Sequence, residues 1–214
     1  FATAEVIAFA GAKPIFVDSD PLTFNMCHID LEKKVQEQYL KSKDKLKAII
    51  TVDLFGLPAN YKKINKISKK YGLKIIEDAA QGFGGTINGK RAGSFGDIAT
   101  TSFFPAKPLG CYGDGGAVFT NNSGYAEQIK SLRVHGKGAD KYDNVQVGMN
   151  SRLDTIQAAI LLEKLKAFPR ELVKRNELAE KYHTIYGDLF ETPHIPMGYS
   201  SSWAQYTIKT DSRD

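Results

Sequence analysis

Short apolar runs alternate with helical patterns along most of this 214-residue chain. The runs at 46–52 and 73–76 are rich in β-branched residues, as is typical of strands buried on both faces of a parallel sheet. Apolar residues at helical spacing precede each run, over 30–42 and over 61–71, and Gly72 marks the end of the second pattern. This alternation predicts an α/β fold with a mostly parallel sheet flanked by helices.

The remaining elements are predicted from the same signals. Helices are expected at 2–10, 124–133, 153–166 and 169–190, and strands at 14–18, 98–104, 117–120 and 203–209. A hairpin is expected around Asn88-Gly89. A Pro/Gly/Ser-rich stretch at 193–202 predicts a division into a large domain, 1–190, and the start of a smaller one, 191–214.

Composition excludes several classes of protein. No apolar run approaches the roughly 20 residues of a membrane helix, and no secretory signal is expected. The two cysteines, Cys27 and Cys111, form no disulfide framework, which favours the cytoplasm. The net charge is +5, but the lysines are dispersed over helical segments such as 61–70 and 164–181, so no nucleic-acid partner is expected.

A single lysine lies in a stiff apolar loop at 102–116. Pro105 and Pro108 restrict their own φ and the conformation of the residue before each, so Lys107 is held in a turn. Four glycines follow between 110 and 116 and permit positive φ or a close backbone approach. An amine desolvated by neighbouring apolar side chains loses affinity for its proton and becomes nucleophilic. The competing interpretation is an ordinary surface lysine, one among 29 Lys and Arg.

Asp78 and Ser102 each come at the end of a predicted strand. Ligands of open α/β sheets bind beyond the carboxyl ends of the strands, so these residues and Lys107 are expected at one edge. Asp78 could alternatively cap a helix. A lysine and a carboxylate at one sheet edge are what pyridoxal phosphate requires: the lysine binds the cofactor covalently and the acid keeps the pyridine nitrogen protonated. Ser102 and the glycine-rich backbone could bind the phosphate.

Three motifs in this order resemble the sugar-nucleotide aminotransferases of the DegT/DnrJ/EryC1/StrS family. They are EDAAQGFG at 77–84, SFFPAKPLG at 102–110 and GMNSRLDTIQAA at 148–159. The resemblance extends over essentially the whole chain. It implies the fold-type I, aspartate aminotransferase-like fold of pyridoxal-phosphate enzymes, with a seven-stranded type of sheet that is incomplete in this fragment. The continuation CYGDGG at 111–116 most resembles the branch that aminates UDP-linked 3-oxo-N-acetylglucosaminuronate for O-antigen synthesis.

The resemblance also implies a role for each matching residue. Lys107 matches the lysine that binds the cofactor and moves the proton, Asp78 the acid at the pyridine nitrogen, and Gln81 a glutamine near the ring hydroxyl. Ser102 matches the phosphate-binding serine, and Asn150 an asparagine that reaches the phosphate across a homodimer interface. The expected substrates are a keto-sugar nucleotide and, as amino donor, glutamate; no metal ion is expected.

Arg152 matches an arginine near the acid groups of the substrate. Independently, Ser151 and Asp154 suggest the start of a helix. A cation in the first turn of a helix interacts unfavourably with the helix dipole, so an anionic partner is expected near Arg152. The alternative is a solvated surface arginine. The apolar face of this helix is expected to comprise Leu153, Ile156, Ile160 and Leu165. His135 also matches a family motif, but a hydrogen-bonded structural histidine is the favoured interpretation.

Relative to the family, the sequence departs at both ends. The upstream phosphate loop, the aromatic residue that stacks on the cofactor and most of the smaller domain are expected to lie outside this chain, which begins at Phe1. Three alternatives stay open. A family dehydratase would carry histidine in place of Lys107, a regulator would bind the cofactor without turnover, and a Rossmann-type module would need a Gly-x-Gly-x-x-Gly motif that is not found after the first predicted strand.

Overall fold

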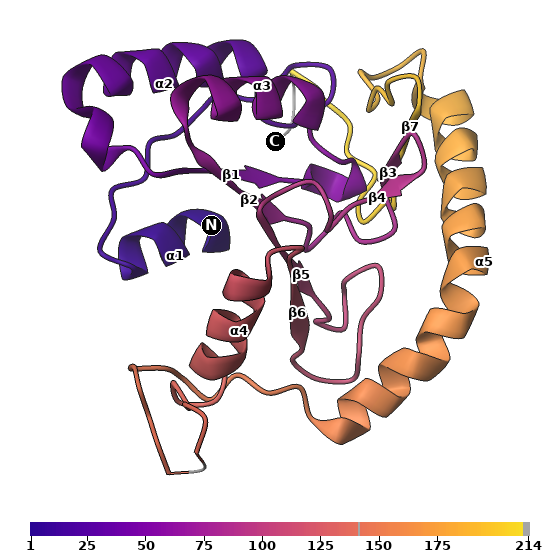
Figure 1. Ribbon diagram of the computed structural model, residues 1–214. Helices are drawn as coiled ribbons and strands as arrows, with labels where there is room; N and C mark the ends of the chain where they lie inside the picture. The colour runs from indigo at the N-terminus through magenta and orange to yellow at the C-terminus, as the bar shows by residue number, and fades with distance from the viewer. Residues whose placement is uncertain (141, 212–214) are drawn as a thin grey trace.

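A four-stranded sheet forms the centre of the computed structural model, which describes residues 1–140 and 142–211 (Figure 1). Its strands are β1 (Ala48–Val52), β2 (Lys74–Asp78), β5 (Ile98–Ser102) and β6 (Gly116–Phe119), in the order β1-β2-β5-β6. The first three are parallel, and β6 is antiparallel to β5. The predicted α/β class with a mostly parallel sheet is confirmed.

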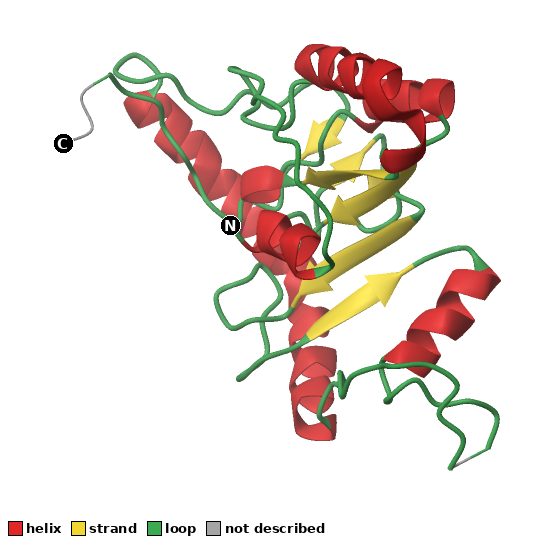
Figure 2. Cartoon of the chain, turned by 90° about the vertical axis from the view of Figure 1, so that its left-hand side faces the viewer, coloured by secondary structure: helices red, strands yellow, loops and turns green. Residues whose placement is uncertain are grey.

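Helices cover the two sides of this sheet. The helices α2 (His28–Ser42) and α3 (Tyr61–Tyr71) lie together over one side, whereas α5 (Thr155–Tyr186) arcs along the other (Figures 1 and 2). The shorter helices are α1 (Ala2–Phe9) and α4 (Ser123–Leu132). A small antiparallel sheet, β4-β3-β7, lies beside α5 and comprises β3 (Thr86–Ile87), β4 (Lys90–Arg91) and β7 (Tyr199–Ser200).

Each helical layer packs on its own apolar cluster. On the α2–α3 side, Ile64 and Ile75 are almost fully buried and belong to a cluster that also contains Leu31, Val35, Ile49 and Ile67. On the α5 side, Phe168 packs with Phe103, Leu109, Cys111 and Leu161. Burying one such side chain stabilises the fold by about 2 kcal/mol, so the two clusters fix the sheet between its helical layers.

Local signals explain where α3 and α4 begin and end. Asn60 and Asn122 are the residues before the two helices, and their side-chain oxygens accept backbone N–H hydrogen bonds from Lys63 and Tyr125. Gly72 ends α3 in the left-handed conformation, at φ 68°. The predicted hairpin is also confirmed, because Asn88 and Gly89 both have positive φ between β3 and β4.

Two predicted strands are absent from the described residues. The segment at 14–18 has no strand beside it, and Phe16 is 72% exposed, so its apolar sequence has no ladder to join. The segment at 203–209 is turned at Trp203, where φ is 49°, and it forms one bridge only, between Glu191 and Lys209. Both segments contain residues that favour strands, but neither lies beside a strand with which it could form a ladder.

The helices predicted at 153–166 and 169–190 form one continuous helix, α5. Pro169 lacks an amide donor, yet the helix continues because Phe168 and Leu172 contact the same cluster on either side of it. The predicted apolar face is wrong in part. Ile156 is 74% exposed and Leu165 is 46% exposed, and the residues of α5 that are buried are Leu161, Phe168 and Ala179.

None of the helices in the described part of the chain combines the length and apolar character that crossing a membrane requires.

Candidate functional site

The carboxyl ends of β2 and β5 meet at one edge of the sheet. Asp78 is the last residue of β2 and Ser102 the last of β5, and Asp78 is in register with Thr100. Just beyond β2, the N–H of Ala79 donates to the carbonyl of Thr100 at 2.8 Å. Because the two strands are parallel neighbours, Asp78 and Ser102 leave the sheet at the same edge, as predicted.

Asp78 is partly buried and hydrogen-bonded on both carboxylate oxygens. Its Oδ2 accepts from the hydroxyl of Thr3 at 2.7 Å, and its Oδ1 accepts from the N–H of Ala80 at 3.2 Å. Thr3 lies in the first turn of α1, which Figure 2 shows in front of this edge. No sequence signal pointed to Thr3, since the two residues are 75 positions apart.

Gln81 lies in the turn that follows Asp78 and is held from three sides. Its Oε1 accepts from the N–H of Phe55 at 2.8 Å, and its backbone carbonyl accepts from the hydroxyl of Ser202 at 2.7 Å. Its Nε2 lies 3.4 Å from Oε1 of Gln205. Gln81 is therefore held by the loop that follows β1 and by the segment at 202–205.

Lys107 lies on a loop pinned at its base by main-chain hydrogen bonds. The N–H of Phe103 donates to Gly115, the N–H of Cys111 donates to Phe103, and the N–H of Lys107 donates to Phe104. The Lys107 side chain is half-buried and makes no hydrogen bond or ion pair within 1–140 and 142–211. Lys107 thus lies five residues beyond Ser102, and its amine has no hydrogen-bond or ion-pair partner among the described residues.

Two expectations for this loop need correction. The neighbouring apolar side chains expected to desolvate Lys107 are buried only in part: Phe103 and Leu109 are buried, but Phe104 is 50% exposed and Pro105 is also exposed. The glycines at 110–116 have no positive φ. Their role is close approach: a Cβ on Gly110 would lie 2.5 Å from the carbonyl oxygen of Pro105, because the loop folds tightly back on itself.

Asn150 and Arg152 lie apart from this edge, on the exposed segment that precedes α5. Nε of Arg152 donates to Oδ1 of Asn150 at 2.9 Å, and Asn150 forms a bridge with Val134. Neither contacts Asp78, Gln81, Ser102 or Lys107 within the residues that the structure describes.

The expectation that the ring of His135 is hydrogen-bonded is wrong. This ring forms no hydrogen bond within the described residues. The backbone of His135, at φ 57°, instead donates to the carbonyl of Met149 and accepts from the side chain of Asn144.

An apolar groove of about 1190 Å³ runs along β6 and α4. The segment 147–153 forms its far wall, and Asp114, Gly115 and Gly116 bring the end of the lysine loop to it. Arg152 also lines it. None of Asp78, Gln81, Ser102 or Lys107 does, so this groove adjoins the candidate site without containing it.

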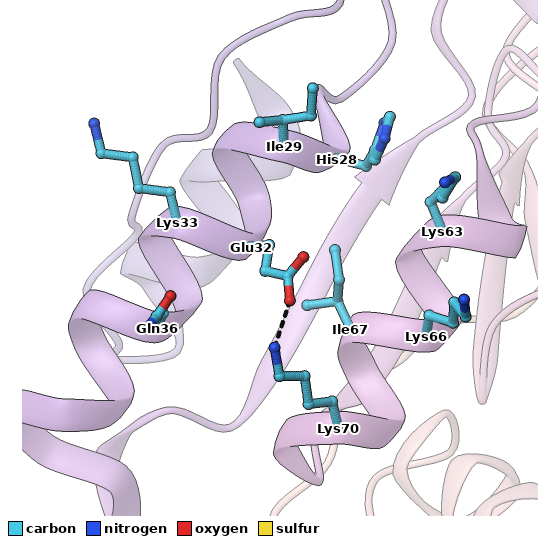
Figure 3. Close-up of a pocket in the computed structure, with 9 residues that line it drawn as sticks. All are labelled: His28, Ile29, Glu32, Lys33, Gln36, Lys63, Lys66, Ile67 and Lys70. Carbon is cyan, nitrogen blue, oxygen red and sulfur yellow. Dashed lines mark hydrogen bonds and ion pairs between the residues drawn. The ribbon is translucent and has the colours of Figure 1, made fainter.

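A second groove, of about 670 Å³, lies between α2 and α3 (Figure 3). Lys33, Lys63, Lys66 and Lys70 line it, and Lys70 pairs with Glu32 across the helices at 2.6 Å. Both partners of this pair are about half exposed, and pairs of this kind are well solvated. The groove is therefore a charged outer surface, and none of Asp78, Gln81, Ser102 and Lys107 lines it.

Comparison with known proteins identifies the family. The model of the DegT/DnrJ/EryC1/StrS aminotransferase family matches residues 1–214. The chain belongs to this family. The family is one of pyridoxal-phosphate-dependent enzymes, so the predicted family, fold class and cofactor class are confirmed.

Three relatives of this DegT/DnrJ/EryC1/StrS member show how far the similarity extends. The chain is 46% identical over 214 residues to a UDP-2-acetamido-2-deoxy-3-oxo-D-glucuronate aminotransferase of Pseudomonas aeruginosa, and 46% identical over 218 residues to a pleiotropic regulatory protein of Geobacillus stearothermophilus. A solved DegT DnrJ EryC1 StrS aminotransferase from Brucella abortus superimposes with a TM-score of 0.96 at 50% identity. All of this chain is covered in each comparison, but it spans only 57%, 56% and 57% of the respective relatives.

Proposed function

We propose that the full-length protein is a pyridoxal-phosphate-dependent aminotransferase that moves an amino group from glutamate to a keto-sugar nucleotide. The proposed acceptor is UDP-2-acetamido-2-deoxy-3-oxo-glucuronate, in the synthesis of amino sugars for O-antigen polysaccharide in the cytoplasm. The carrying observation is that Asp78 and Ser102 end adjacent parallel strands, with the unpaired amine of Lys107 on the next loop.

The donor set at the sheet edge fits this cofactor. A carboxylate offers about four acceptor positions, and hydrogen bonds from Thr3 and Ala80 occupy two of those of Asp78, which leaves room for a protonated ring nitrogen. Ser102 supplies a hydroxyl at the neighbouring strand end. Lys107 supplies an amine that no acid of the described residues neutralises. Acid, hydroxyl and amine thus lie on consecutive segments of one edge.

Each residue has a distinct task in the proposed reaction. When bound, pyridoxal phosphate supplies an electron sink for the carbon that loses its proton. The amine of Lys107 takes the Cα proton from the amino donor and returns a proton to the sugar carbon that receives the nitrogen. Asp78 keeps the ring nitrogen protonated, and its hydrogen bonds from Thr3 and Ala80 fix its orientation. Ser102 binds the phosphate, and Gln81 lies beside the ring hydroxyl.

A homodimer would complete this site. Asn150 and Arg152 are exposed and lie next to Val145, Val147 and Met149, which are 64%, 94% and 61% exposed. Apolar side chains clustered in this way on a surface are characteristic of protein–protein contacts. We therefore assign Asn150 to the phosphate of the partner's site and Arg152 to the acid groups of the sugar nucleotide.

The function is tested by product analysis with the full-length protein. Purified enzyme is incubated with pyridoxal phosphate, glutamate and a panel of UDP- and dTDP-linked keto sugars, and the products are identified by mass spectrometry. Release of 2-oxoglutarate together with an amino sugar from the UDP-3-oxo-glucuronate substrate is the expected result. Amination of a different keto sugar would correct the substrate, and no amination of any would refute the activity.

A second candidate is a regulator that binds pyridoxal phosphate without turnover. The observation that favours it is the 46% identity to a protein named as a pleiotropic regulator. The unpaired lysine at position 107 fits both functions, but the same assay separates them, since a regulator would bind the cofactor and release no 2-oxoglutarate.

A dehydratase of the same family is disfavoured, because such an enzyme would carry histidine where this chain carries Lys107.

A further inference from the structure

Two carboxyl groups are completely buried directly behind the candidate site. Asp53 follows β1 and Glu77 is the residue of β2 before Asp78; both are 0% exposed. Neither takes part in the proposed reaction, and neither is paired with a cation in the described part of the chain. Two ionised carboxylates in one buried site repel each other strongly, so such a pair is stable only when one of them holds a proton.

Glu77 is the member of the pair whose two oxygens both accept hydrogen bonds. Its Oε1 accepts a hydrogen bond from the N–H of Gly93, and its Oε2 accepts from those of Phe95 and Gly96 at 2.7 and 3.0 Å. Three backbone donors converge on this carboxylate, so both of its oxygens already act as acceptors. Glu77 is therefore the acceptor of any proton that the pair shares.

Asp53 is arranged to be the donor. Its Oδ1 accepts from the hydroxyl of Tyr61 at 2.7 Å and from the N–H of Ala59 at 3.0 Å, whereas its buried Oδ2 has no donor directed at it among the described residues. Burial, and then the negative charge of Glu77, raise the pKa of Asp53 well above its usual value. A proton on Oδ2 would satisfy this atom by making it a donor to Glu77.

Asp53 also contacts the residues assigned to the cofactor. Its N–H donates to the carbonyl of Asp78 at 3.0 Å, and it begins the loop in which the N–H of Phe55 holds Gln81. Gly82 lies against it so closely that a Cβ there would be 2.5 Å from Cβ of Asp53. The acid pair thus joins the end of β1 to the turn that carries Asp78 and Gln81.

We propose that Asp53 is a positioning residue, a neutral carboxylic acid that donates Oδ2–H to Glu77 and thereby fixes the orientation of Asp78 and Gln81. Its location behind the cofactor rests on the proposed function, but its protonation does not. Glu77 of β2 is in register with Thr51, two residues before Asp53 on the adjacent strand, and Tyr61 of α3 donates to Asp53 from the other side. Among the described residues no cation faces the pair.

The protonation is tested by the unfolding of the full-length protein without cofactor. Asn is the neutral isostere of a protonated Asp. A buried acid with a raised pKa contributes stability that is complete below the unfolded-state pKa and is lost as the pH rises. Hence the stability of Asp53→Asn relative to wild type should increase steadily from about pH 4 towards pH 8. An unchanged or decreasing difference over that range would show that Asp53 is ionised.

Asp97→Asn is the matched control, because the pKa of Asp97 is shifted in the opposite direction to that of Asp53. Burial alone would raise the pKa of Asp97, but hydrogen bonds from the N–H of Ile75 and from Lys74 outweigh this effect and lower it. Its contribution to stability is therefore present above the unfolded-state pKa and is lost as the pH falls. Asp97→Asn should be less stable than wild type at neutral pH, and the deficit should close in acid.

The positioning role is tested by pyridoxal phosphate binding at a temperature where every variant is folded. Asp53→Ala should bind the cofactor about tenfold more weakly. Asp53→Asn should restore wild-type binding, because its amide can still accept from Tyr61 and Ala59 and donate to Glu77. If Asp53→Ala is destabilised but binds the cofactor normally, Asp53 is a core residue only. If wild type itself does not bind, the proposed function fails, while the pH series still reports on the acid pair.

Discussion

Lys164 donates a hydrogen bond from its ammonium group to the carbonyl oxygen of Gly110, although the two residues are 54 positions apart. The same ammonium group lies 5.5 Å from the centre of the Tyr112 ring, and the N–H of Tyr112 donates to Oε1 of Gln157 at 2.8 Å. Two residues of α5, about two turns apart, therefore hold the loop that carries Lys107 against the helix.

Lys164→Met should loosen this loop without unfolding the protein. Methionine keeps the apolar part of the side chain and removes the donor, so the free energy of unfolding should fall by about 1 kcal/mol. Pyridoxal phosphate should bind roughly tenfold more weakly, which an absorbance titration would measure. Lys166→Met is the control, because the side chain of Lys166 is 70% exposed and, among the described residues, forms an ion pair with Glu163 alone. Equal effects of the two changes would show that α5 does not hold the loop.

Lys107→Ala should remove both the cofactor linkage and the proton carrier. The absorbance near the visible edge that arises when lysine binds pyridoxal phosphate should disappear, and transamination should fall by roughly 10³-fold or more. Lys107→Arg keeps the positive charge but is no nucleophile, so it should be equally inactive. Unchanged spectra and turnover in either variant would remove Lys107 from the mechanism.

Asp78→Asn should preserve the hydrogen bond from Thr3 but remove the negative charge. Without that charge the ring nitrogen is not held protonated, and kcat should fall roughly 10²- to 10³-fold at saturating cofactor. Thr3→Val removes only the hydroxyl that donates to Asp78 at 2.7 Å, so about a fivefold loss is expected. A larger effect of Thr3→Val than of Asp78→Asn in steady-state assays would contradict this order of roles.

The residues of the candidate site that lie at the ends of strands could be predicted from the sequence. Asp78 and Ser102 come at the ends of predicted strands whose parallel pairing follows from the alternation of strands and helices. Lys107 follows in a loop that its prolines exclude from helix. Thr3 and Asp53 could not be predicted in this way. Their contacts depend on tertiary packing between segments that share no local pattern.

The errors in the predicted elements have the same origin. The 14–18 segment has the composition of a strand, but strand formation requires a neighbour, which the described chain does not provide. Pro169 is a local signal for a helix end, yet packing of Phe168 and Leu172 on one cluster keeps α5 continuous. The local sequence predicted the secondary structure correctly only where the tertiary contacts favoured the same structure.

Gly56→Ala should destabilise the protein far more than Gly72→Ala, although both glycines have positive φ. A Cβ on Gly56 would lie 2.5 Å from Oγ of Ser202 and 2.7 Å from N of Trp203, whereas a Cβ on Gly72 meets no atom within 4 Å. We expect about 1 kcal/mol for Gly72→Ala, from the backbone alone, and about 3 kcal/mol or more for Gly56→Ala, where overpacking adds to it.

Urea unfolding of the full-length variants measures this difference, and cofactor binding tests its consequence for the site. Ser202 bonds to the carbonyl of Gln81 and also, through its N–H, to the carbonyl of Gly56 at 2.9 Å. Displacing Ser202 should therefore release the turn that carries Gln81, and Gly56→Ala should bind pyridoxal phosphate more weakly even where it is fully folded. Gly72 lies at the end of α3, in a different part of the fold, so Gly72→Ala should bind the cofactor as wild type does. Similar unfolding free energies for the two variants would mean that the 201–205 segment yields to the added methyl group and does not hold Gln81 in place.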